Sequence, residues 1–108
     1  MNKKQARIVN AIEKIKRELL YLGPMRPGTL SRQFKNPKAQ KGPFWQLSYT
    51  HRMKSKTEYV RPAFLPQIKA ETQNFKKYKK LTQRWADLAL QLSKENVRAA
   101  IQSGSINL

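Results

Sequence analysis

Apolar side chains recur at helical spacing near the start of the chain. They follow one another at intervals of four, three, four and three residues, namely Ile8, Ile12, Ile15, Leu19 and Leu22. Because residues at these intervals share one face of an α-helix, the pattern predicts an amphipathic helix. Gly23 suits a helix C-terminus, and Pro24 cannot continue the hydrogen-bond ladder. The predicted helix therefore spans residues 3–22.

Between residues 28 and 61 the apolar spacing changes to two, which is typical of β-strands. The apolar positions are Leu30 and Phe34 in a first run and Trp45, Leu47 and Tyr49 in a second. A third run of alternating residues covers 57–61. Prolines, glycine and asparagine over residues 35–43 predict a loop, and residues 54–56 predict a short turn. Together these signals predict a three-stranded antiparallel meander.

A second helical pattern follows two prolines at positions 62 and 66, which suit the first turn of a helix. Its stripe steps by three and four residues through Leu65, Ile68, Thr72, Phe75, Tyr78, Leu81, Trp85, Leu88 and Leu92. No glycine or proline interrupts it before Gly104, so we expect one helix of about 35 residues, roughly 50 Å long. A break near Thr82 is the alternative.

These elements predict a single small α+β domain over residues 1–102 and a flexible tail over residues 103–108. Its order is an N-terminal helix, the three-stranded antiparallel sheet and the long C-terminal helix. We expect the two helices to pack antiparallel to each other.

The chain carries a large excess of positive charge. Among 108 residues, 23 Lys and Arg oppose 6 Asp and Glu, a formal net charge of +17. Residues 19–57 and 72–86 contain no acid at all. A merely solubilising charge would intersperse acids among the bases, whereas cations that neutralise phosphates release counterions and bind without sequence preference. The expected partner is therefore nucleic acid, either DNA or structured RNA.

The predicted nucleic-acid contacts are the cations in and beside the acid-free runs, together with one aromatic ring. The loop at 35–41 and the turn at 52–56 are expected to form one surface, with the later cations on the solvent side of the long helix. Phe44 is the candidate for stacking on bases, because Trp45 and Tyr49 lie on the opposite, core-facing side of the same strand. The full set is Arg26, Arg32, Lys35, Lys38, Lys41, Phe44, Arg52, Lys54, Lys56, Arg61, Lys76, Lys77, Lys79, Lys80 and Arg84.

The basic face of the long helix has other potential targets, namely an anionic membrane or an acidic protein. Phosphate is favoured over both. A stretch of about 20 apolar residues that could span a bilayer is missing, so we expect a cytoplasmic protein that has no membrane partner.

The sequence contains few residues that could catalyse a reaction. His51 is the single histidine, the acids are too scattered to hold a metal, and cysteine is absent. Four isolated glycines do not make a phosphate-binding loop. We therefore expect a non-enzymatic protein without cofactor or metal. An RNase that uses His51 with Tyr49 or Arg52 is the enzymatic alternative.

A second hypothesis is protein docking. The apolar stripe at Trp85, Leu88 and Leu92 could bind a partner, as in an accessory subunit of a transposase or RNA-guided nuclease complex. The same stripe could pair with a second copy of the chain in a homodimer.

Three segments carry a resemblance to known proteins: Gly28-Thr29-Leu30, then Gly-Pro-Phe-Trp-Gln-Leu-Ser-Tyr over residues 42–49, and then Tyr59-Val60 with Pro62 opening a charged helix. Over residues 25–95 the chain resembles a family of small, basic, uncharacterised bacterial proteins often encoded near mobile-element genes. The resemblance implies a hairpin-plus-helix architecture and suggests an association with mobile DNA. Family members commonly carry cysteines in the stretch that corresponds to residues 34–41. This chain has none there, which favours a purely electrostatic role for that loop.

Overall fold

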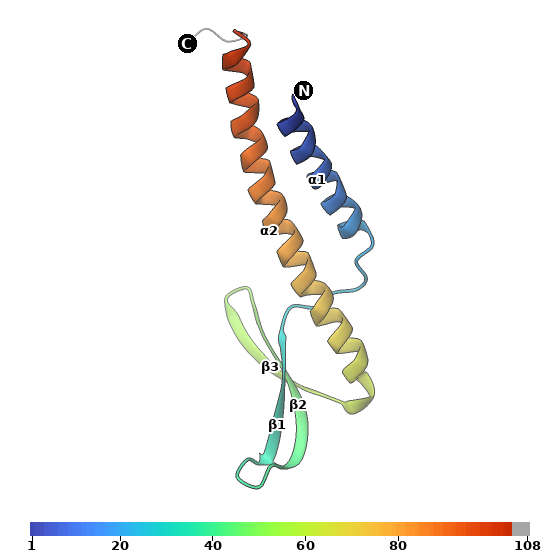
Figure 1. The fold of residues 1–108 in the computed structure, drawn as a ribbon. Helices are drawn as coiled ribbons and strands as arrows, with labels where there is room; N and C mark the ends of the chain where they lie inside the picture. Colours follow the sequence, from blue (N-terminus) through green and yellow to red (C-terminus); the bar gives the residue numbers. More distant parts are fainter. Residues whose placement is uncertain (105–108) are drawn as a thin grey trace. The chain divides into compact units, whose positions relative to one another are not determined.

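The structure, a computed structural model, describes residues 1–104 and is an α+β fold (Figure 1). Its elements in order are α1 (Lys3–Leu20), β1 (Thr29–Asn36), β2 (Lys41–His51), β3 (Lys54–Val60), the short 3-10 helix η1 (Pro62–Phe64) and α2 (Leu65–Gln102). The predicted order of helix, three-stranded antiparallel sheet and long helix is confirmed.

The chain forms two compact units. The sheet unit comprises Gly23–Lys77, and the helical unit comprises Met1–Leu22 with the chain from Tyr78 onward. The boundary between them falls within α2. The single domain over residues 1–102 stays a prediction. Of the predicted tail, residues 105–108 lie outside the described part of the chain, whereas the backbone N–H of Ser103 still donates to the carbonyl of Ala99.

Helix α1 begins with a reciprocal cap. The side chain of Asn2 accepts from the N–H of Gln5, and the side chain of Gln5 accepts from the N–H of Asn2, so two donors without intrahelical partners are satisfied. The helix ends at Leu20, two residues before the predicted end near Leu22. The N–H of Leu22 reaches back only three residues, to Leu19, because the chain tightens before leaving the helix. The predicted stripe is buried at Ile8, Ile12 and Ile15.

Within the helical unit, α1 and the C-terminal part of α2 run antiparallel, as predicted (Figure 1). Near one end, Gln5 donates to Asn96 at 2.8 Å. Near the other, the ammonium of Lys16 lies 5.5 Å from the ring centroid of Trp85. The early residues of α1 therefore lie beside the late residues of α2, and the buried isoleucines face the stripe of α2.

The sheet has the order β1-β2-β3, and both pairings are antiparallel. Its core consists of Leu47, Val60 and Ile68. Because Ile68 lies near the start of α2, this core joins the sheet to the first turns of that helix. Trp45 and Tyr49 pack against this core, as predicted. We call this the helix-facing side. Because alternate side chains of a strand point to opposite faces, Phe44 lies on the other side, which we call the open side.

Both predicted connections in the sheet are too long and are wrong in their bounds. Strand β1 continues to Asn36 and β2 begins at Lys41, so residues 37–40 alone form the first turn. Asn36 tightens it by accepting from the N–H of Ala39 at 3.3 Å. The second turn is residues 52–53 rather than 54–56. Strand pairing extends as far as the backbone allows, so the turn-forming residues mark the ends of the strands rather than a whole loop.

Helix α2 is continuous over 38 residues, and the alternative break near Thr82 is wrong. The hydroxyl of Thr82 donates to the carbonyl of Tyr78 at 2.8 Å, one turn earlier, so this polar residue is satisfied inside the helix. The helix follows η1, whose first residue is Pro62, where a missing N–H costs nothing.

Candidate nucleic-acid interface

The positive charge is concentrated in the sheet unit, which carries twelve Lys and Arg against only two acids. Both acids already have partners. Glu58 binds Arg26 and Tyr49, and Glu71 accepts from the side-chain amide of Gln67 at 3.2 Å. Of the two, only Glu58 forms a salt bridge within the described residues, with Arg26, and two acids leave most of the twelve cations of this unit without a counter-charge.

Six of the predicted contact residues form two separate groups, one at each turn of the sheet. The first-turn cluster is Lys35, Lys38 and Lys41, and the second-turn cluster is Arg52, Lys54 and Lys56. All six are exposed, and none lies within salt-bridge distance of an acid in residues 1–104. Their side chains are thus available to phosphate groups.

The two clusters do not converge, and the expected single surface is wrong. In a meander, successive turns lie at opposite ends of the middle strand, and here that strand is β2, with 11 residues (Figure 1). At about 3.4 Å per residue, the clusters are about 34 Å apart along β2 if the strand is straight. They make two cationic patches with the sheet between them.

Arg26 was predicted to contact nucleic acid, but its side chain is committed to the sheet unit. Its guanidinium donates to a carboxylate oxygen of Glu58 and lies 5.4 Å from the ring centroid of Tyr49. The Tyr49 hydroxyl donates to the other carboxylate oxygen at 2.6 Å. These three side chains form what we call the Glu58 cluster.

The Glu58 cluster shifts the pKa of each member. Hydrogen bonds from Tyr49 and then from Arg26 hold the pKa of the Glu58 carboxyl below its usual value. The hydrogen bond to Glu58 raises the pKa of Tyr49. Desolvation opposes the charge on Arg26, but the hydrogen bond and negative charge of Glu58 outweigh it and raise the pKa of Arg26. The acid is therefore held ionised, between a guanidinium and a hydroxyl.

Cations also cover aromatic rings on the helix-facing side of the sheet. Arg32 lies 5.3 Å from the ring centroid of Phe34, and Lys69 lies 4.9 Å from that of Trp45. Such contacts are attractive because the ring face is negative. The guanidinium of Arg32 therefore stabilises the sheet unit through its contact with Phe34. Sequence reasoning missed Lys69, because its partner becomes apparent only when α2 is placed on the sheet.

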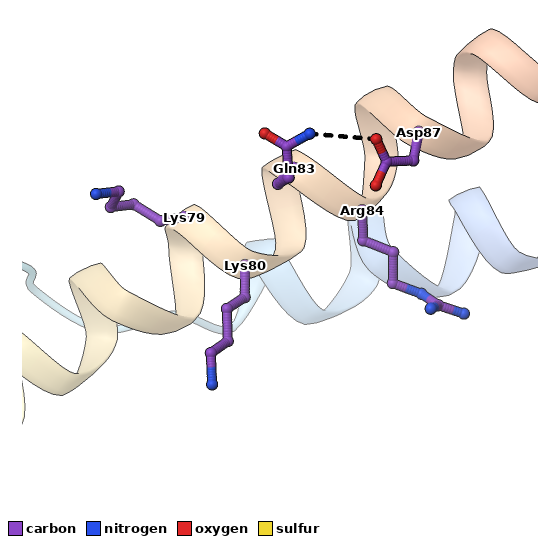
Figure 2. Close-up of a pocket in the computed structure, with 5 residues that line it drawn as sticks. All are labelled: Lys79, Lys80, Gln83, Arg84 and Asp87. Carbon is purple, nitrogen blue, oxygen red and sulfur yellow. Dashed lines mark hydrogen bonds between the residues drawn. The ribbon is translucent and has the colours of Figure 1, made fainter.

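The predicted cations of α2 fall in both units: Lys76 and Lys77 end the sheet unit, and the others belong to the helical unit. A shallow hollow of about 480 Å³ on α2 is lined by Lys79, Lys80, Gln83, Arg84 and Asp87 (Figure 2). Figure 2 shows Lys80 and Arg84, one turn apart, extending to the same side of the helix. Asp87 accepts from Gln83 at 3.2 Å, on another side. Lys80 and Arg84 thus place two cations on one side of the helix.

The predicted docking residues Trp85, Leu88 and Leu92 are half-buried in the helical unit, and Lys16 covers the Trp85 ring. Beyond Trp85, the exposed large apolar residues of α2 are Leu90, Val97 and Ile101. Sequence reasoning missed them, although their spacing of seven and four residues places them on one face of the helix.

His51, the basis of the enzymatic alternative, ends β2 opposite Lys54 and is exposed. Residues 1–104 contain no group of three or more His, Cys, Asp or Glu side chains suited to hold a metal ion. Within the same residues, every helix is too short or too polar to cross a lipid bilayer.

Comparison of the chain with protein-family models, with curated proteins and with solved structures finds no match.

Proposed function

We propose that this protein binds nucleic acid without catalysing a reaction, chiefly through the phosphate backbone. The observation that carries the proposal is the excess of twelve cations over two acids in the sheet unit, in which the first-turn and second-turn clusters are exposed and form no salt bridge within residues 1–104. Charge of one sign with no local counterion attracts a polyanion and steers it to the surface.

The contacts divide into positioning cations and one candidate for base contact, Phe44. The two turn clusters, with Lys80 and Arg84 on α2, supply phosphate contacts that fix the ligand without reading its sequence. Arg26 is set apart, because its guanidinium is occupied by Glu58. The proposal therefore assigns affinity to the turns and to α2.

Salt dependence tests this proposal directly. If about six phosphates are neutralised, affinity for a short DNA or RNA should fall roughly 10³-fold between 50 and 200 mM salt, with a log–log slope near −5. Fluorescence anisotropy with labelled oligonucleotides measures this slope. A flat salt response, or no binding at 50 mM salt, would overturn the proposal.

A second candidate function is docking to a protein partner, as an accessory subunit of a transposase or RNA-guided nuclease complex. The exposed apolar residues Leu90, Val97 and Ile101 favour it, because they lie on one face of α2. Light scattering on the purified protein, with identification of any copurifying protein, tests it. A monomer that copurifies with nucleic acid alone would contradict docking. The association with mobile DNA remains a prediction from the resemblance.

A further inference from the structure

Two aromatic rings lie together on the open side of the sheet. Phe44 pairs with Gln33 across β1, and Tyr59 pairs with Gln46 across β2, so both rings project from the same face. Their centroids are 6.5 Å apart and their planes are tilted by 45°. Tyr59 is 61% exposed.

These two rings differ from the others of the sheet. On the helix-facing side, Phe34, Trp45 and Tyr49 each lie under a cation. For Phe44 and Tyr59, the described residues supply no cation, and their one ring contact is with each other. The fold therefore places a cation over three rings and leaves a pair without one, on the side of the sheet opposite the core of Leu47, Val60 and Ile68.

Cations flank this pair. Lys35 lines a hollow of about 330 Å³ together with Pro43, Phe44 and Tyr59. A neighbouring hollow of about 310 Å³ is lined by Tyr59 and Arg61, among others, and also by the ion pair of Arg26 and Glu58. Tyr59 thus stands between two hollows, each of which has a cation on its wall. A base in contact with the rings would have its phosphates within reach of Lys35 on one flank and Arg61 on the other.

The remaining open-side positions are polar but uncharged. Ser31, Gln33 and Gln46 surround the two rings along β1 and β2. Such side chains both donate and accept hydrogen bonds, so they suit the edges of bases rather than phosphate. The open side therefore combines stacking surface, polar groups and flanking positive charge.

We propose that the open side of the sheet is a platform for unpaired nucleobases, which stack on Phe44 and Tyr59 while Lys35 and Arg61 contact the flanking phosphates. This inference rests on the proposed function and names its ligand class as single-stranded nucleic acid. A duplex does not fit this platform, because its bases already stack on one another and expose only their edges. In single-strand binders, stacking on aromatic side chains is a major source of affinity and tolerates any base.

The test compares a single-stranded oligonucleotide with two probes: a duplex of the same length, and an abasic strand that keeps the phosphates but lacks the bases. The wild-type protein should bind the normal single strand about tenfold more tightly than the abasic strand. Phe44→Leu and Tyr59→Leu keep apolar bulk but remove the ring, and each should abolish most of this preference. Tyr59→Phe keeps the ring and should retain it. Tyr21→Leu, which removes an exposed ring from the helical unit, is the matched control.

The outcomes separate this inference from the proposed function. If the wild-type protein binds normal and abasic strands equally with a steep salt slope, phosphate binding stands and the platform is wrong. If no probe binds at low salt, the proposed function fails. If the leucine variants lose affinity for all three probes in parallel, or if Tyr59→Phe behaves like Tyr59→Leu, the platform is also wrong. Circular dichroism melting checks that each variant is folded.

Discussion

Arg26, in the segment before β1, donates its guanidinium to the carboxylate of Glu58 on β3, 32 residues later. This ion pair bridges the chain that enters the sheet and the strand that leaves it. The hydroxyl of Tyr49, on the middle strand, donates to the other carboxylate oxygen of Glu58 at 2.6 Å. The three segments of the sheet unit are thereby joined by side chains at one carboxylate.

The Glu58 cluster predicts a specific pH dependence. Because the folded state lowers the pKa of Glu58, the unfolded state binds more protons at acid pH. This contribution to stability is present above the ordinary pKa of a glutamate in the unfolded chain and is lost as pH falls through the lower pKa of the folded protein. Glu58→Gln should therefore destabilise the protein near pH 7 and flatten its loss of stability below about pH 5. Urea unfolding at a series of pH values measures both effects.

The companion variant for this experiment is Tyr49→Phe, which removes one hydrogen bond to Glu58 but leaves Arg26 in place. Its stability should also fall less steeply at acid pH than that of the wild-type protein, but the difference should be smaller than for Glu58→Gln. Parallel pH profiles for wild-type protein and Glu58→Gln would contradict the assigned role of the cluster.

Gly28→Ala should destabilise the sheet unit. A Cβ at Gly28 would lie 2.6 Å from Cδ1 of Leu47, the fully buried residue of the core, and the backbone φ of 142° disfavours any side chain. We expect a loss of about 2–3 kcal/mol in the free energy of unfolding, as for other overpacked or strained positions. Chemical denaturation measures it. Gly23→Ala is the control, because its Cβ would meet only the flexible side chain of Asn74. Equal stability of the two variants would show that the approach of Gly28 to Leu47 is not tight.

Met53→Gly should stabilise the second turn of the sheet. Arg52 and Met53 have φ values of 50° and 64°, and a two-residue hairpin turn with positive φ at both positions strongly favours glycine at the second. Met53 is 97% exposed, so little packing is lost. We expect a gain of about 1 kcal/mol in the free energy of unfolding. Met53→Ala, which keeps the unfavourable φ, should show no such gain in thermal unfolding. A lower melting temperature for Met53→Gly would argue against backbone strain at this turn.

Neutralising the first-turn cluster should weaken nucleic-acid binding uniformly across sequences. Lys38→Gln with Lys41→Gln removes two exposed cations, and each lost phosphate contact should reduce the salt slope by about 0.9. Lys16→Gln is the control, because Lys16 already pairs with Glu13 at 3.1 Å and lies beside Trp85. Titrations at several salt concentrations measure the slopes. An unchanged slope in the double variant would remove the first-turn cluster from the interface.

Local patterns predicted the elements well. The stripe through Ile8, Ile12 and Ile15 and the alternation through Trp45 and Leu47 depend on neighbours only a few residues away, so sequence spacing alone identifies the buried faces. Turn bounds depend instead on how far two strands stay paired. Proline and glycine in residues 35–43 therefore overstated the first turn.

The candidate site was predictable in its residue types but not in its arrangement. Which acid neutralises Arg26 depends on the placement of residues 32 positions apart, and the cation over Trp45 comes from α2. One error was avoidable, because a meander always places successive turns at opposite ends of its middle strand. The separation of the two turn clusters was therefore already implied by the predicted topology.

The three-stranded sheet has two unpaired margins, since β1 and β3 each have a neighbour on one side only. Lysines stand along both, with Lys35 on β1 and Lys54 and Lys56 on β3. Charged side chains at such margins repel a second copy that would otherwise extend the sheet into a fibre. The same ammonium groups that suit a phosphate ligand thus also protect against aggregation, so extensive replacement of them would weaken binding and promote aggregation together.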